Sequence, residues 1–327
     1  ITMCLYLGCC FQHCPSSGFA TRSSADYSQA GARACSSSAE SSRTPLLGTR
    51  PQGKEVLNRS EKCTGAPISS DGMKVSIITV CFNSADTIEE TIRSVRDQQY
   101  ECIEHIIIDG GSTDGTQEVV GRHNGRIRKF ISEPDRGIYD AMNKGLALAT
   151  GEIVAFLNAD DVYASPRVID DVVAAMQAQH CDGVYGDLVY VRRHDSRHIL
   201  RYWRAGEYRP NAFYRGWVPP HPTFFCRSTL YRELGGFDPT YRIAGDFELM
   251  LRFIAKNNIG IHYVPKPFVR MRMGGRANTV RGMIRGNREI VRAFRRNDLQ
   301  FSPRFFCGKL VYKMHQLVSR PHNNSRS

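Results

Sequence analysis

Short apolar runs alternate with helical patterns between residues 75 and 191, and this alternation restricts the fold more than any other feature of the sequence. Residues 75–80 are rich in β-branched side chains, which is typical of a strand buried on both faces. Further strands are predicted at residues 104–108, 128–131, 153–157 and 183–191, and helices at residues 88–95, 138–149, 168–179, 228–234, 246–256, 281–296 and 303–318. The chain is therefore predicted to be an α/β protein with a mainly parallel central sheet flanked by helices, followed by C-terminal helices.

Polar segments follow three of the predicted strands, at residues 81–83, 109–114 and 158–161. In parallel sheets, ligands collect at the carboxyl ends of the strands. The three segments are therefore expected to lie on one ligand-binding rim.

Two adjacent carboxylates, Asp160 and Asp161, end the strand predicted at residues 153–157. Like charges held together are costly unless a positive group neutralises them. A Mg²⁺ or Mn²⁺ ion bound through one or two carboxylates and the phosphates of a ligand would do so, which makes both residues candidate metal ligands. The alternative is that one of them caps the helix starting near Ser165.

Residues 109–115 form a glycine-rich segment, Asp-Gly-Gly-Ser-Thr-Asp-Gly. Glycines let the backbone approach a ligand, and Asp109 or Asp114 can accept hydrogen bonds from ribose hydroxyls or base N–H groups. The alternative is a plain turn before a short helix at residues 117–120. The chain has no G-x-G-x-x-G and no Walker A motif, so neither a dinucleotide site nor a P-loop is predicted.

Four further charged or titratable positions are candidates for chemistry. Arg136 and Lys144 are able to reach a diphosphate, although loop and helix-surface charges would give the same pattern. Asp246 is a candidate general base, and as a helix N-cap it would look identical in sequence. An exposed loop carboxylate at this position would be ionised near neutral pH without special tuning. His221, between two prolines, either faces the phosphates or is a structural histidine.

Residues 1–72 differ in texture from the rest of the chain. From residue 14 they are rich in Ser, Ala, Gly and Arg without a sustained period, and we interpret them as disordered or as sequence upstream of a true start at Met73. The eleven cysteines, an odd total without paired spacing, favour reduced thiols and a cytoplasmic location. Residues 1–11 lack the basic flank of a secretory signal, and no apolar run approaches the ~18 residues that span a bilayer.

The net charge of +12 is concentrated in residues 281–327, which hold eleven Lys and Arg against two Asp and Glu. The predicted helix at residues 303–318 has an apolar stripe, whereas Lys309 and Lys313 face away from it. The stripe consists of Phe306, Leu310, Met314, Leu317 and Val318. A basic tail with one apolar face predicts contact with an anionic membrane surface. The alternative is that the stripe packs on the rest of the protein.

Taken together and in this order, these segments resemble the family 2 glycosyltransferases, which have the GT-A fold. The resemblance covers about residues 73–272, and residues 133–145 look especially like the bacterial branch that builds exopolysaccharide, colanic-acid-like and O-antigen repeat units. It implies an inverting, single-displacement transfer of a sugar from an NDP-sugar donor with a divalent cation. The expected organisation is an extension at residues 1–72, a GT-A domain at 73–280 and a basic amphipathic helical tail at 281–327.

The resemblance also implies roles for individual residues. Phe82 stands where the family usually has a Tyr beside the nucleobase, Asp160 and Asp161 occupy the metal and diphosphate motif, and Asp246 sits at the catalytic-base position. The donor-binding residues expected on this basis are Val80, Phe82, Asn83, Asp109, Asp114, Arg136, Asn143, Lys144, Asn158, Asp160 and His221.

Two positions depart from the family pattern. Family members commonly have a second Asp where this chain has Gly110, so either Asp109 reads the base or no carboxylate does. Asn158 replaces a frequent Asp, which leaves metal binding mainly to Asp160 and Asp161.

Two other functions compete with the transferase hypothesis. A nucleic-acid-binding protein would use the basic tail and the Arg- and aromatic-rich residues 192–217, but it leaves the paired carboxylates unexplained. A non-catalytic sugar-nucleotide binder would hold the donor without needing Asp246. We predict a transferase acting on a glycan or lipid-linked glycan in cell-surface polysaccharide biosynthesis, at the inner face of the cytoplasmic membrane, with no nucleic-acid partner.

Overall fold

The fold was analysed in a computed structural model that describes residues 54–55, 72–123, 125, 127–274 and 279–318. The strands are β1 (Lys54–Glu55), β2 (Val75–Cys81), β3 (Ile103–Asp109), β4 (Lys129–Ser132), β5 (Ile153–Phe156), β6 (Val162–Tyr163), β7 (Gly183–Arg192), β8 (Asp195–Trp203), β9 (Phe225–Arg227) and β10 (Ile261–Arg272). The α-helices are α1 (Ile88–Arg96), α2 (Thr116–Gly121), α3 (Ile138–Leu148), α4 (Val168–Gln179), α5 (Ser228–Leu234), α6 (Gly245–Met250), α7 (Val280–Arg296) and α8 (Arg304–Val318). There are also two 3₁₀ helices, η2 (Ala212–Arg215) and η3 (His221–Thr223), and a π-helix, η4 (Leu251–Lys256), among the described residues. The disorder predicted for residues 1–72 falls almost wholly outside the described residues.

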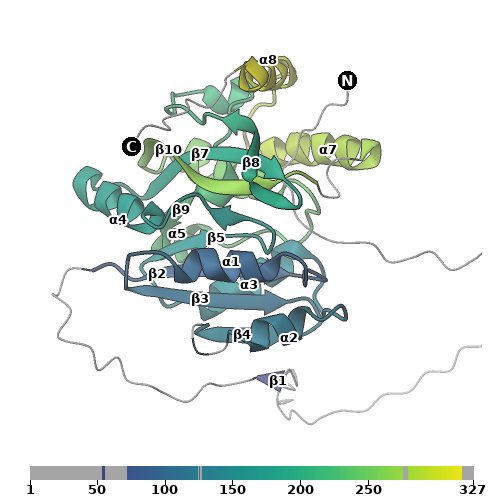
Figure 1. Ribbon diagram of the computed structural model, residues 1–327. Coiled ribbons are helices and arrows are strands. Elements are labelled where there is room, and N and C mark those ends of the chain that lie inside the picture. Colours follow the sequence, from purple (N-terminus) through teal and green to yellow (C-terminus); the bar gives the residue numbers. More distant parts are fainter. Residues whose placement is uncertain (1–53, 56–71, 124, 126, 275–278, 319–327) are drawn as a thin grey trace, which may run out of the picture. The chain divides into compact units, whose positions relative to one another are not determined.

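The described strands form one sheet in the order β1-β4-β3-β2-β5-β9-β7-β10-β6, with β8 paired to β7 (Figure 1). The predicted α/β architecture is confirmed, because β4, β3, β2 and β5 are parallel neighbours in its centre. Cys81 at the end of β2 pairs with Asp109 at the end of β3, so the two predicted rim segments that follow these strands start side by side.

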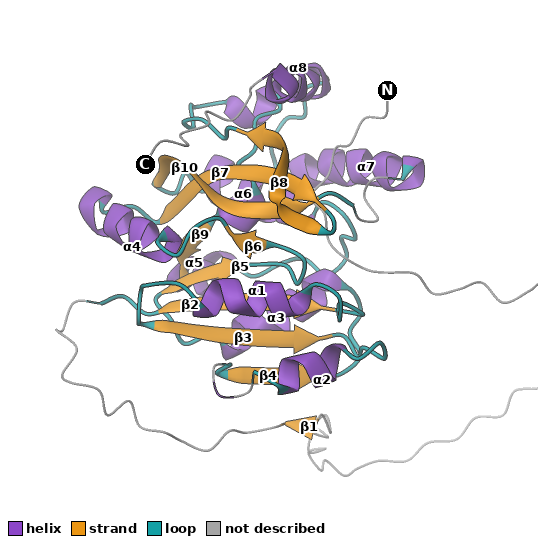
Figure 2. Ribbon diagram, in the orientation of Figure 1, coloured by secondary structure: helices purple, strands orange, loops and turns teal. Residues whose placement is uncertain are grey.

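Alternate residues of β2 serve two separate cores, as expected of a strand covered on both faces. Ile78 belongs to the cluster that includes Tyr139 of α3, whereas Ile77 belongs to the cluster that includes Val172 of α4. Figure 2 shows α1 in front of the strands and α3 behind them. Gly145 lets α3 lie close to the sheet, since a Cβ there would come within 2.4 Å of the Ile78 side chain.

The short strand β9 runs antiparallel between β5 and β7 and interrupts the parallel order. The turn η3 leads directly into it, which places His221 next to the central strands. The His221 ring stacks on Phe156, the last residue of β5, with 5.8 Å between ring centroids.

The C-terminal helices pack on the same core. Ile290, Ala293 and Phe294 of α7 are buried in the cluster that includes Phe247 of α6. Phe305 of α8 joins this cluster and is fully buried. Of the helices described, none combines the length and the apolar character needed to span a bilayer.

Candidate active site

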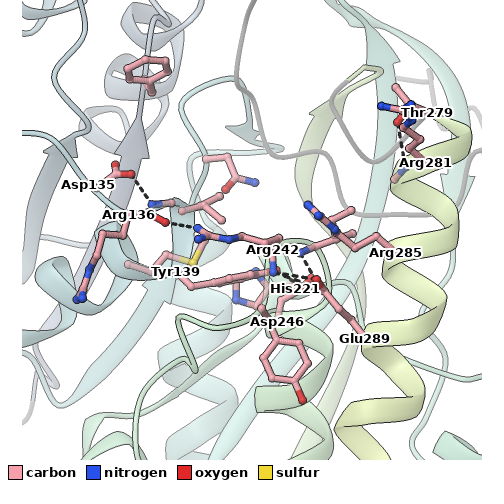
Figure 3. Close-up of a pocket in the computed structure, with 18 of the residues that line it drawn as sticks. Asp135, Arg136, Tyr139, His221, Arg242, Asp246, Thr279, Arg281, Arg285 and Glu289 are labelled. Carbon is pink, nitrogen blue, oxygen red and sulfur yellow. Dashed lines mark hydrogen bonds between the residues drawn. The ribbon is translucent and has the colours of Figure 1, made fainter. Parts of the chain in front are cut away.

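A cavity of about 1120 Å³ opens between the carboxyl ends of the central strands and helix α7 (Figure 3). The predicted candidates that line it are Phe82, Arg136, Asn158, His221 and Asp246. The other lining residues include Gly110, Asp135, Tyr139, Met142, Tyr241, Arg242, Arg281, Ile284, Arg285, Arg288, Glu289 and Arg292.

Asp135 occupies the space that the side chain of a larger residue would need at position 110. A Cβ on Gly110 would lie 2.5 Å from Oδ2 of Asp135 and 3.3 Å from the Phe82 ring. Within the described residues, this buried Oδ2 has no hydrogen-bond partner, whereas Oδ1 accepts from the Gly137 amide at 2.7 Å. Burial, before any charge effect, raises the pKa of Asp135. Asp135 therefore brings a carboxylate to the place where Gly110 lacks one, and the sequence analysis did not single it out.

Asp109 is fully buried and its carboxylate is used inside the protein. Oδ2 accepts hydrogen bonds from the Ser112 amide at 2.9 Å and the Ser132 hydroxyl at 2.6 Å, and Oδ1 accepts from the Ser112 hydroxyl. Asp109 thus holds the loop after β3 and does not line the large cavity.

Asp114 and Asn83 tie together the loops that follow β3 and β2. Asp114 accepts from the backbone amides of Ala85 and Thr116, at 3.0 and 3.1 Å. The Asn83 side chain accepts from the Thr113 amide at 3.0 Å, and Asn83 has a positive φ of 50°. Neither residue lines the large cavity, so they shape the rim instead of facing it.

Asp160 and Asp161 are both buried immediately after β5. Oδ2 of Asp161 accepts a hydrogen bond from the side-chain amide of Asn158 at 2.9 Å, whereas Oδ1 has no hydrogen-bond partner among the described residues. Burial, followed by the charge of Asp160, raises the pKa of Asp161 well above its usual range. The N-cap alternative is excluded, because α4 begins after Arg167 and has no side-chain cap. Asn158 lines the cavity, whereas Asp160 and Asp161, which follow it in the sequence, do not line it.

Asp246 lies in the first turn of α6, inside the helix rather than at its N-cap, which is Ala244. The expectation of an exposed base is wrong, because only 4% of Asp246 is exposed. Burial raises its pKa to about 7. The Tyr139 hydroxyl donates to Oδ1 of Asp246 at 3.3 Å and accepts from the Gly245 amide at 2.9 Å.

Glu289 of α7 fixes the loop that leads into Asp246. Its carboxylate accepts hydrogen bonds from the backbone amides of Arg242, Ile243 and Ala244, at 2.8 to 3.2 Å. No local sequence pattern predicts this contact, since Glu289 lies more than forty positions from the loop that it holds.

His221 and Arg136 line the cavity, whereas the two polar candidates on α3, Asn143 and Lys144, do not. Burial lowers the pKa of His221 to about 4, so the ring is neutral at physiological pH. The Asn143 side chain donates to and accepts from the Phe237 backbone at 2.8 and 2.9 Å. Lys144 pairs with Glu133 at 2.7 Å and, like Asn143, does not line the large cavity. Val80 lines only a small adjoining pocket of about 10 Å³.

Two glycines allow α8 to lie close to η2: Gly308 in the helix and Gly216 directly after η2. The lysines of α8 lie on the side of the helix that faces the protein. A Cβ on Gly308 would lie 1.8 Å from the Arg215 carbonyl oxygen, and one on Gly216 would lie 2.3 Å from the Lys309 amide. Lys313 is buried, and burial lowers the pKa of Lys309 to about 7 while the charge of Asp246 opposes this shift. Both lysines thus face away from Leu310 and Met314 of the predicted stripe, but on the side of α8 that is turned toward the protein.

The predicted apolar stripe of α8 lies mostly on the exposed side. Leu310 and Met314 are 44% and 56% exposed, while Phe306 packs partly against the core. The side chains of Leu317 and Val318 are outside the described part of the chain.

Two solved structures illustrate the likeness of this architecture to known proteins. TarS from S. aureus in complex with UDP-GlcNAc has a TM-score of 0.55 and 19% identity, and the match covers 73% of each chain. The mannosyltransferase PcManGT from Pyrobaculum calidifontis, in complex with GDP-Man and Mn2+, has a TM-score of 0.54 and 22% identity over 76% of this chain and 70% of that one. These likenesses show that the chain has the GT-A fold.

The sequence profile described as Glycosyl transferase family 2 matches residues 76–243. An uncharacterised glycosyltransferase of Mycobacterium tuberculosis is 34% identical over 194 residues, which is 54% of this chain and 68% of the relative. A PGL/p-HBAD biosynthesis glycosyltransferase of Mycobacterium bovis is 28% identical over 212 residues, 63% of this chain and 79% of that protein. The chain therefore belongs to glycosyltransferase family 2, and the transferase hypothesis is preferred over nucleic-acid binding.

Proposed function

We propose that this glycosyltransferase moves a sugar from an NDP-sugar, with inversion, to a hydroxyl of a lipid-linked glycan in cell-surface polysaccharide biosynthesis. The observation that carries the proposal is the placement of Asp246. It lies in the same cavity as Phe82, Asp135 and Asn158, and burial raises its pKa to about 7. A general base works best when its pKa is near the operating pH.

The donor would bind at the strand-end side of the cavity. Phe82 provides a ring for the nucleobase, and the Asp135 carboxylate, whose Oδ2 has no partner among the described residues, can accept from base or ribose groups. The remaining donor contacts in this proposal are Arg136, Asn158, Asp160 and His221. TarS and PcManGT, solved with UDP-GlcNAc and GDP-Man, support a nucleotide-sugar donor.

A Mg²⁺ or Mn²⁺ ion fits the paired carboxylates after β5. Burial and the charge of Asp160 raise the cost of ionising Asp161, and a cation would offset this cost. Asp160 and Asp161 would hold the ion, and Asp161 accepts a hydrogen bond from the side chain of Asn158, which lines the cavity. When bound, the ion supplies positive charge that stabilises the departing diphosphate. PcManGT was solved with Mn2+, which supports this choice of cofactor.

The chain's own residues supply the base and its positioning. The ionised Asp246 takes the proton of the acceptor hydroxyl, whose oxygen then attacks the anomeric carbon as the bond to the diphosphate breaks. Attack from the side opposite the leaving group inverts the anomeric centre. Tyr139 orients the Asp246 carboxylate, and Glu289 holds the preceding loop.

Substituting Asp246 tests the proposal directly. Donors are first identified by thermal stabilisation with UDP- and GDP-sugars and Mn²⁺. We expect Asp246→Asn to bind the identified donor as the wild type does and to lose transfer to the acceptor by at least about a hundredfold. Glu101→Gln, on the exposed surface, is the matched control. Unchanged transfer by Asp246→Asn would instead favour the non-catalytic sugar-nucleotide binder.

The exposed side of α8 supports peripheral contact with the cytoplasmic face of a membrane. Leu310, Val311 and Met314 present 44%, 65% and 56% of their surface, on a chain segment with a strongly basic balance. We expect Leu310→Glu/Met314→Glu to reduce sedimentation with anionic vesicles, whereas Leu310→Ala/Met314→Ala should reduce it less. Equal sedimentation of the wild type and the Glu variant would exclude this surface.

A further inference from the structure

Helix α7 carries a row of arginines that faces the active-site cavity. Arg281, Arg285, Arg288 and Arg292 follow one another at spacings of four, three and four, which places them on one helix face. All four line the large cavity, and Figure 3 shows Arg281 and Arg285 on this helix. At 1.5 Å per residue the row extends over about 16 Å. It is therefore longer than a single phosphate requires.

In the part of the chain that the structure describes, three of the four arginines are not held in ion pairs, whereas Arg292 donates to the Thr240 hydroxyl and lies over the Tyr241 ring. Glu289, the acidic residue of α7, is occupied by the loop amides that precede Asp246. Within the described residues, no carboxylate forms an ion pair with Arg281, Arg285 or Arg288. The cavity therefore offers several guanidinium groups to an anion.

The row lies across the cavity from the proposed donor side. In Figure 3, Asp135 and Arg136 lie on one side, Arg281 and Arg285 on the other, and Asp246 lies between them. Because the base contacts the acceptor hydroxyl, a base between two binding regions would have the donor on one side and the acceptor on the other. The row is thus placed to contact the molecule whose hydroxyl Asp246 activates.

A second groove, of about 750 Å³, adjoins the row. Arg288 and Arg292 line both this groove and the large cavity. The apolar side chains of Ile284, Val291 and Phe306 also line it, together with Asn287, Arg295 and Arg296. Positive charge beside an apolar groove complements a molecule in which a phosphate is attached to a hydrocarbon chain.

We propose that the arginine row of α7 binds the phosphate or diphosphate that joins the acceptor sugar to its lipid, and that the groove receives the first part of that lipid. Arginine suits this task because its planar fork donates two parallel hydrogen bonds to phosphate oxygens. The inference rests on the proposed function and names the site that recognises the acceptor.

Binding measurements on Arg285→Gln/Arg288→Gln test the site. Both residues are exposed, so the fold should tolerate the change, and Arg122→Gln/Arg232→Gln removes the same charge from exposed positions outside both cavities. The probes are farnesyl diphosphate, inorganic pyrophosphate and farnesol, with UDP or GDP plus Mn²⁺ to report on the donor side. Calorimetry gives each dissociation constant.

We expect wild-type protein to bind farnesyl diphosphate more tightly than pyrophosphate or farnesol. The α7 variant should bind both diphosphates at least about tenfold more weakly, with nucleotide binding unchanged and the control variant like wild type. A parallel loss of nucleotide binding would assign the row to the donor diphosphate and overturn the proposal. Failure of wild-type protein to bind farnesyl diphosphate would also overturn it.

Vesicles of phosphatidylcholine and phosphatidylglycerol distinguish a bound acceptor from a membrane headgroup. If the α7 variant loses vesicle binding but keeps farnesyl diphosphate binding, the row contacts the membrane surface and the acceptor site is wrong. These experiments measure binding only, so their outcome is independent of whether Asp246→Asn abolishes transfer. The acceptor site and the proposed reaction can therefore fail separately.

Discussion

The Tyr139 hydroxyl of α3 donates a hydrogen bond to Oδ1 of Asp246 in α6, at 3.3 Å, and accepts one from the adjacent Gly245 amide. A hydrogen bond to an ionised carboxylate favours the ionised form, so this contact lowers the pKa of Asp246 against the larger effect of burial. Tyr139, more than a hundred positions before Asp246 in the sequence, thus helps to set the pKa of the proposed base.

Replacing Tyr139 should shift the pH dependence of transfer. Tyr139→Phe removes the donor, so the pKa of Asp246 should rise and the ascending limb of kcat/KM should move from about pH 7 to higher pH. At pH 7 we expect a decrease of roughly threefold to tenfold, recovered in part at pH 9. Tyr312→Phe, on exposed α8, is the control, and a uniform loss at every pH would argue for a purely structural role.

Asp246 should make the folded protein less stable as the pH rises. Its pKa is raised from an ordinary value of 3.8 to about 7, so the folded state retains a proton that the unfolded chain releases. The stabilisation is full below about pH 4 and is lost as the pH passes 7. Asp246→Asn should therefore raise Tm relative to wild type at pH 8 but not at pH 4. At pH 8 the gain in unfolding free energy should reach up to roughly 4 kcal/mol. Scanning calorimetry at both pH values measures the difference, and an equal effect at both would refute the titration.

Asp135 and Gly110 should behave as a matched pair in donor binding. Asp135→Ala removes the buried carboxylate and should weaken UDP or GDP binding about tenfold. Gly110→Asp alone brings a side chain against Asp135, whereas Gly110→Asp/Asp135→Gly returns one carboxylate to the same space. We expect the double variant to bind better than either single variant by calorimetry. If Asp135→Ala binds like wild type, Asp135 is not a donor contact.

Docking of α8 should depend on Gly308. A methyl group there would lie 1.8 Å from the Arg215 carbonyl oxygen, so Gly308→Ala should displace the helix and lower the free energy of unfolding by about 1–3 kcal/mol. Hydrogen exchange across α8 should accelerate. Gly121→Ala is a suitable control, because nothing lies within 4 Å of the added carbon. Protection of α8 equal to that of wild type would contradict the close approach.

The sequence predicted the central strands well but missed β1, β6, β8, β9 and β10. The strong alternation of apolar runs and helices made residues 75–191 readable, because burial on both faces leaves a continuous apolar strand. β9 has only three residues. β10 contains two prolines, which argue against a strand; Pro267 is accommodated at a break in register with β7.

The candidate site was predicted in outline, and its electrostatics were not. Phe82, Asn158 and Asp246 do meet in one cavity, as the order of the motifs suggested. Asp246 is buried in a region packed by aromatic residues that are distant in sequence. One of them is Phe305, whose ring centroid lies 5.6 Å from that of Phe247, the residue after Asp246. Asp135 became visible only through its closeness to Gly110. The arginines of α7 looked like part of a basic tail, because one-dimensional charge does not show which face of a helix borders a cavity.

Helix α3 links the proposed donor contact to the proposed base. Asp135 just precedes the helix, Tyr139 in its first turn holds the proposed base Asp246, and Asn143 one turn later anchors the loop at Phe237. Tyr139 and Asn143 lie on one rigid helix, separated by about 6 Å of helical rise. Any displacement of α3 along its axis would therefore carry the partner of Asp246 and the Phe237 loop in the same direction.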